Sequence, residues 1–121
     1  MGPKMNLPQW LKTILGQHQK PVIRRPDDSH SLRVRRRLRF SGLVQGVGFR
    51  FEAKITADEL GLVGWAKNED DGTVTIEVEG PEVCVDEFIR VMGSVPRFRI
   101  TGMQSEDLPF FCAEGSFRAL Y

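Results

Sequence analysis

The sequence predicts an α+β domain in which an antiparallel sheet carries two helices on one face. Apolar and polar residues alternate over residues 74–79, which is typical of a strand. Apolar residues recur at helical spacing after Phe49 and again after Pro81. Glycine, proline and Asp-Gly turn signals separate these segments. Taken in order, the elements read βαββαβ.

The first strand is expected from about Val34, in an arginine-rich stretch. Leu38 and Phe40 alternate there with charged neighbours, so we expect both to face the core. The same alternation assigns Arg35, Arg37 and Arg39 to the opposite face. We expect these arginines to form a solvated surface rather than a nucleic-acid reader.

The first helix is expected directly after a glycine-rich loop. Its apolar face is formed by Phe49, Ala53, Ile55 or Thr56, Ala57 and Leu60. Gly61 stands where a left-handed C-terminal cap belongs. Residues 62–68 then read as a second strand, and Asp71-Gly72 is a hairpin turn into the third.

The second helix is expected to open at Gly80-Pro81-Glu82 and to end at Gly93. Its predicted buried face consists of Val85, Phe88, Ile89 and Met92. A fourth strand follows around residues 97–103, with Phe98 and Ile100 inward, and Phe117, Ala119 and Tyr121 indicate a closing strand. This order is that of a ferredoxin-like sandwich.

Residues 1–34 read as a basic extension to a domain that spans residues 35–121. A short amphipathic helix is predicted by one apolar stripe, formed by Leu7, Trp10, Leu11, Ile14 and Leu15, with a stop at Gly16. Such a helix needs a surface, and the sequence leaves open whether this is the domain, a second copy in an oligomer, a partner or a membrane interface. Residues 21–31 read as a linker.

Length and composition limit the classes of function that this chain can have. The chain of 121 residues fits one globular domain and has no apolar run long enough to span a membrane. We expect a cytoplasmic protein whose cysteines, Cys84 and Cys112, are buried thiols. Both histidines, His18 and His30, lie in the extension, which leaves the domain without the usual general base and metal ligand. No metal or cofactor is therefore expected.

The candidate site is the loop between the first strand and the first helix. Gly42, Gly46 and Gly48 free the backbone to turn and to bring N–H groups close to an anion. The following helix directs its positive end at the loop, and Arg50 supplies a fork of donors suited to phosphate. The spacing fits neither a dinucleotide fingerprint, since Phe51 stands at the third glycine position, nor a Walker loop. We expect a small phosphate site.

The segment 44–50 (VQGVGFR), followed by Ala57, Leu60 to Trp65, Asn68, Asp71-Gly72 and Glu79-Gly80, resembles the acylphosphatase family throughout residues 35–121. The resemblance implies hydrolysis of small acyl phosphates to a carboxylate and inorganic phosphate, without metal or covalent intermediate. It assigns the catalytic roles to Arg50 and Asn68. Phosphate would be bound by Gln45, Gly46, Val47, Gly48, Phe49 and Arg50, with Asn68 orienting a water for in-line attack.

The sequence also places two acidic residues close to the predicted phosphate site, which is expected to hold an anion. Glu52 and Glu69 lie next to the two catalytic residues, and a like charge a few ångströms from the phosphate would cost about 1–4 kcal/mol. Catalytic efficiency and the physiological acyl phosphate stay open at this point.

The charge of the chain is divided between its two parts and motivates a second hypothesis. Residues 1–40 carry ten Lys or Arg against two Asp, a balance of +8, and the remainder carries 7 Lys or Arg against 14 Asp or Glu, a balance of −7. The simplest interpretation is that the arm lies against its own acidic domain, and nucleic acid is not expected as a partner. The alternative is a non-catalytic anion-binding or regulatory module whose arm docks a partner or nucleic acid. A third reading is a module of the kind that begins multidomain carbamoyl-transfer proteins, which the same family resemblance implies.

Overall fold

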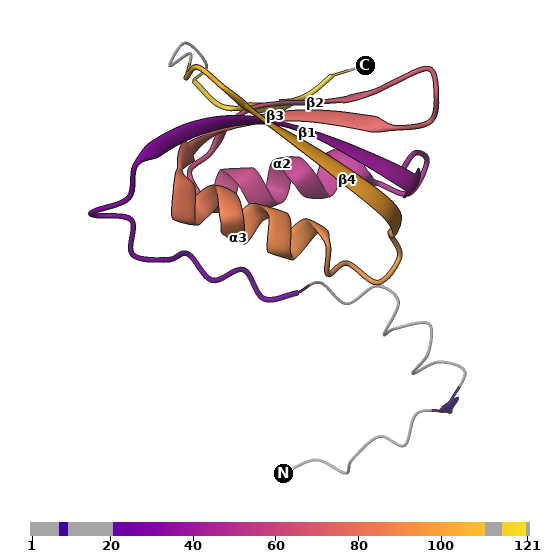
Figure 1. The fold of residues 1–121 in the computed structure, drawn as a ribbon. Coiled ribbons are helices and arrows are strands. Elements are labelled where there is room, and N and C mark those ends of the chain that lie inside the picture. The colour runs from indigo at the N-terminus through magenta and orange to yellow at the C-terminus, as the bar shows by residue number, and fades with distance from the viewer. Residues whose placement is uncertain (1–7, 10–20, 111–114, 121) are drawn as a thin grey trace, which may run out of the picture.

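A computed structural model describes residues 8, 9, 21–110 and 115–120. A twisted sheet lies over two helices that cover one of its faces (Figure 1). The elements are β1 (Arg33–Leu43), α2 (Phe49–Glu59), β2 (Val63–Asn68), β3 (Val74–Pro81), α3 (Glu82–Met92), β4 (Arg99–Leu108) and β5 (Phe117–Ala119). The predicted ferredoxin-like sandwich is confirmed. The predicted N-terminal helix and Tyr121 lie outside the described residues.

The sheet has five strands in the order β4-β1-β3-β2-β5. The pairs β1–β3, β1–β4 and β2–β3 are antiparallel, whereas β2 and β5 are parallel. The expectation of a wholly antiparallel sheet was therefore wrong for its last strand. β4 ends at the end of the sheet where β2 begins, and β5 begins at that same end, so β5 runs in the direction of β2.

The core lies between the sheet and the helices, where the alternation placed it. Leu38 and Phe40 of β1 are buried, and every residue from Val74 to Gly80 in β3 is buried. The helices contribute Phe49, Ala53 and Ala57 from α2 and Cys84, Val85, Phe88 and Met92 from α3. Phe49 packs between Phe40 and Phe98, with ring centroids 5.0 and 4.8 Å away. The first residue of α2 is thereby fixed in the core, and the glycine loop before it is fixed at one end.

The face of the sheet opposite the helices is a network of ion pairs. Arg35 is 4% exposed and contacts Glu77 at 2.9 Å and the fully buried Glu79 at 3.6 Å. Arg33 and Arg37 pair with the same two carboxylates, at 2.6 and 2.9 Å. The expectation of a solvated arginine surface was wrong for Arg35, because the neighbouring strand β3 places carboxylates directly opposite the arginines.

Residues 21–32 contain no helix or strand, as the linker interpretation predicted, but they lie along α3 on its side away from the sheet (Figure 1). The Arg24 N–H donates to the Glu87 carboxylate at 2.8 Å, and Arg90 donates to the Val22 carbonyl at 2.8 Å. Ile23 packs against the hydrophobic core. We call this segment the strap. In this part the basic arm does lie against its own domain.

Candidate active site

The glycine loop joins β1 to α2 and is shaped by two left-handed residues. Gly46 has φ +73° and Gly48 has φ +79°, which are backbone conformations that residues other than glycine rarely adopt. Gly48 is the N-cap of α2, and no side chain caps that helix. The first N–H groups of the helix therefore point toward the loop without a side-chain acceptor.

The backbone N–H groups of the loop have no acceptor among the described residues of the loop itself. Within the described part of the chain, the N–H groups of residues 45–48 donate no hydrogen bond to a backbone carbonyl. Unpaired backbone donors beside a helix N-terminus favour a bound anion.

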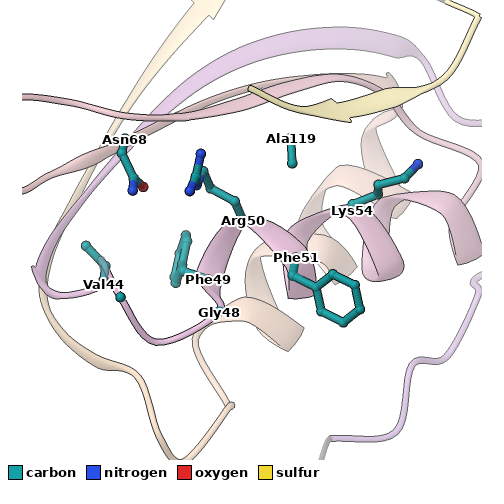
Figure 2. Close-up of a pocket in the computed structure, with 9 residues that line it drawn as sticks. Val44, Gly48, Phe49, Arg50, Phe51, Lys54, Asn68 and Ala119 are labelled. Atoms are coloured by element: carbon teal, nitrogen blue, oxygen red, sulfur yellow. The ribbon is translucent and has the colours of Figure 1, made fainter. Parts of the chain in front are cut away.

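A cavity of about 230 Å³ opens beside the loop (Figure 2). It is lined by Val44, Gly46, Gly48, Phe49, Arg50, Phe51, Lys54, Asn68 and Ala119. These residues come from the loop, the first turns of α2, the end of β2 and the end of β5. Arg50 and Asn68, predicted from distant parts of the sequence, are thus brought to one cavity.

Arg50 extends from the first turn of α2 toward Asn68 (Figure 2). Its guanidinium donates to the Leu120 carbonyl just after β5. The closing strand therefore orients the arginine, which leaves its remaining N–H groups in fixed directions.

Asn68 is the last residue of β2, as predicted. Its side-chain oxygen Oδ1 is buried and has no hydrogen-bond partner within the described residues. A buried acceptor without a partner costs about 1–3 kcal/mol, so its presence needs an explanation. An acceptor at the wall of a cavity that also holds Arg50 is suited to a water or a ligand donor.

The other predicted phosphate-binding residues divide into two groups. Gly46, Gly48 and Phe49 line the cavity, whereas Gln45 and Val47 are not among its lining residues. The Gln45 amide donates to the carbonyls of Glu69 and Thr73, at 2.7 and 2.9 Å, and so braces the β2–β3 hairpin. The Val47 carbonyl accepts from Arg97, which also does not line the cavity.

The two acidic residues that raised a question of repulsion are not among the cavity's lining residues either. Glu52 is 5% exposed and pairs with Arg97 at 2.8 Å. The Glu69 carbonyl accepts from Gly72 and Gln45, which ties its backbone to the hairpin.

Sequence reasoning missed Lys54 and the part of the cavity wall near β5. The Lys54 ammonium donates to Asp58 at 3.0 Å and to the Phe117 carbonyl at 3.1 Å. Lys54 lies one helical turn after Arg50, so the i, i+4 spacing was a signal for the same helix face. Phe51 is 63% exposed at the rim, and Ala119 enters only because β5 lies beside β2, which local sequence does not reveal.

Among the described residues there is no group of three or more His, Cys, Asp or Glu side chains that could hold a metal ion. The helices in the described part of the chain are too short or too polar to cross a bilayer.

The acylphosphatase family model matches residues 36–117. The chain belongs to the acylphosphatase family. An acylphosphatase from Arthrobacter sp. (strain FB24) is 54% identical over 61 residues, which are 50% of this chain and 56% of that protein. One from Enterococcus faecalis is 36% identical over 86 residues, 69% of this chain and 94% of that protein. With this family assignment the chain is an acyl phosphate hydrolase.

Solved structures agree with the family assignment. The crystal structure of acylphosphatase from Bacillus subtilis has a TM-score of 0.69 and 34% identity, and the match covers 73% of this chain and 99% of that chain. Full-length HypF in its phosphate- and nucleotide-bound form is similar over 75% of this chain and 12% of that chain, with a TM-score of 0.68 and 29% identity.

Proposed function

We propose that this acylphosphatase hydrolyses small acyl phosphates by direct attack of water on phosphorus. The supporting observation is the cavity that brings together loop N–H groups, the Arg50 guanidinium and the unpartnered Oδ1 of Asn68. In this proposal the loop N–H groups of residues 45–50 and Arg50 bind the phosphate oxygens. They stabilise the charge that develops as the bond to phosphorus breaks.

Asn68 orients the attacking water. Its Oδ1 accepts one hydrogen of that water, which directs an oxygen lone pair at phosphorus on the side opposite the acyl group. The water oxygen forms the new bond to phosphorus, the bond from phosphorus to the acyl oxygen breaks, and its electron pair leaves with the carboxylate. The products are one carboxylate, one inorganic phosphate and the released proton. Because a carboxylate is a good leaving group, positioning and charge stabilisation are enough without a histidine base or a metal.

The size of the cavity supports a small substrate. Its volume is about 230 Å³, and its rim carries the exposed ring of Phe51. We propose the cytoplasm as the site of action, supported by the free thiol of Cys84 in the core, and cell fractionation tests this. Nucleic acid is not proposed as a partner, because the arginines of β1 are already paired with carboxylates.

The test is hydrolysis of benzoyl phosphate in the presence of a metal chelator. Arg50→Ala removes the phosphate clamp, and we expect kcat to fall by about 10³-fold or more. Asn68→Ala removes the water acceptor, with an expected loss of about 10²–10³-fold. Matched controls are Arg99→Ala and Lys67→Ala, which remove exposed charges outside the cavity. Each variant is first shown to be folded by circular dichroism.

The outcomes separate the proposal from its alternatives. Turnover that resists the chelator and is lost in both site variants, but not in the controls, supports the mechanism. An inert unmodified protein, or site variants as active as the controls, refutes the catalytic assignment of Arg50 and Asn68.

A further inference from the structure

A second arginine, which is not among the residues that line the cavity, binds the glycine loop. Arg97 lies just before β4 and is 24% exposed at its side chain. Its Nε donates to the Val47 carbonyl at 2.9 Å, and a terminal nitrogen donates to Glu52 at 2.8 Å. The guanidinium also lies over the ring of Phe98, 4.9 Å from its centroid. One side chain therefore joins the loop to the helix that follows it.

Arg97 is itself held in place on the helix side. Glu52 is 5% exposed, and its N–H donates to the Gly48 carbonyl at 3.0 Å. A neighbouring cavity of about 180 Å³ is lined by Glu52 together with Pro21 and Ile23 of the strap. The carboxylate that orients Arg97 thus lies in a largely enclosed position, where an ion pair is poorly screened.

The contact with Val47 fixes the direction of an N–H group at the cavity. A trans peptide bond is planar, and its C=O and N–H point in opposite directions. No peptide bond in the described part of the chain is cis. Because the Val47 carbonyl points at Arg97, the N–H of Gly48 in the same peptide unit must point away from Arg97. Gly48 lines the cavity and Arg97 does not, so an N–H that points away from Arg97 is placed to donate into the cavity.

We propose that Arg97, oriented by Glu52, is a positioning residue that keeps the Val47–Gly48 peptide turned with its N–H toward the bound phosphoryl group. Without Arg97 this peptide can flip, and a flipped peptide presents a carbonyl oxygen to the phosphate. The inference rests on the proposed function, because it takes the anion to be the phosphoryl group of the substrate. Arg97 touches neither substrate nor reacting atoms and acts through the loop.

The expected kinetic effect follows from the fraction of molecules with the peptide in the binding orientation. Apparent affinity falls in proportion to that fraction. For Arg97→Met we expect the KM for benzoyl phosphate and the inhibition constant of inorganic phosphate to rise by the same factor, on the order of tenfold. The kcat stays close to that of the unmodified protein, because bound phosphate holds the peptide. Arg97→Lys restores the charge beside Glu52 but not the fork, so it recovers the affinity only in part.

Two variants separate positioning from stability. Arg99→Met is the matched control, because Arg99 is an exposed arginine two positions along and lines no part of the cavity. The double variant Glu52→Gln with Arg97→Met removes both charges and so avoids leaving a buried carboxylate without its arginine. We expect it to recover the thermal stability lost in Arg97→Met and to keep the raised inhibition constant.

A measurement independent of catalysis completes the test. The ¹⁵N relaxation of the Gly46 and Gly48 amides reports loop order in the unliganded protein. We expect order to fall at Gly48 in Arg97→Met and in the double variant, and to stay unchanged in Arg99→Met.

The results distinguish the two proposals. If Gly48 stays ordered in Arg97→Met, or if its inhibition constant equals that of Arg99→Met, the positioning role is refuted. If the unmodified protein neither hydrolyses benzoyl phosphate nor binds inorganic phosphate, the proposed mechanism fails, while loss of order at Gly48 still supports Arg97 as the residue that fixes the peptide.

Discussion

The hydrogen bonds that Glu87 accepts from α3 and from the strap predict a pH-dependent part of the protein's stability. Glu87 accepts from Arg90 at 2.6 and 2.8 Å and from the Arg24 N–H at 2.8 Å. These hydrogen bonds, above all those from Arg90, lower the pKa of Glu87 from its ordinary 4.5 to about 2. A carboxyl group whose pKa is lowered on folding stabilises the folded state above its unfolded pKa. That contribution is lost as the pH falls from about 4.5 toward 2.

The size of this contribution to the free energy of unfolding follows from the same two pKa values of Glu87. At about 1.4 kcal/mol for each pKa unit, the shift from 4.5 to about 2 sets a ceiling of about 3 kcal/mol. Glu87 is 12% exposed at its side chain but Arg90 is 48% exposed, so solvent screens the pair. We therefore expect about 1–2 kcal/mol at pH 7. For a domain of this size, that corresponds to a shift of several degrees in Tm.

The assay is urea unfolding of the full chain and of Glu87→Gln at pH 7 and at pH 3. Gln keeps the shape of the side chain but not its charge, so the difference in unfolding free energy between the two proteins isolates the carboxylate. We expect Glu87→Gln to be less stable by about 1–2 kcal/mol at pH 7, with more than half of this difference gone at pH 3. Glu59→Gln, an exposed carboxylate on α2, is the control and should show no such difference.

One result would refute the reasoning. A gap between the unmodified protein and Glu87→Gln that is equal at both pH values, or absent at pH 7, means that the ionised Glu87 carboxylate does not contribute this part of the stability.

Three further predictions concern the loop and the core. Gly48→Ala places a Cβ on a residue with φ +79°, so we expect about 1–2 kcal/mol of destabilisation in thermal unfolding and a raised phosphate inhibition constant. Burial raises the pKa of the Cys84 thiol, so in a Cys112→Ser background it should react with a thiol reagent at the rate of unfolding rather than that of an exposed cysteine. Arg35→Met leaves the buried Glu79 with one fewer cation, and urea unfolding should show a loss of about 2–4 kcal/mol, whereas an unchanged midpoint would contradict the role of this ion pair.

The order of the elements could be predicted from sequence because each depends on local chemistry. Alternation in β3, the helical stripe of α2 and the Asp-Gly turn are set by neighbours a few residues apart. The glycine loop and Arg50 form a contiguous motif, so their shared place in the fold was also predictable. The family resemblance added Asn68, which no local pattern singles out.

Contacts between distant segments explain what could not be predicted. The alternation in β1 gave the face of Arg35 correctly, but its burial depends on Glu77 and Glu79, which only the strand register brings opposite. In the same way, Glu52 lies close to Arg50 in sequence, yet Arg97 pairs with it away from the cavity.

Periodicity, turn residues and the family motif were sufficient to predict the ferredoxin-like sandwich, the glycine loop and the family. Contacts between distant segments set the parallel direction of β5 beside β2, the position of the strap on α3 and the hydrogen bond from Arg97 to the loop. Each of these depends on side chains or strands far apart in the chain. Local sequence does not show which distant residue will lie within hydrogen-bond distance. In this protein such residues contact both Arg50 and the glycine loop.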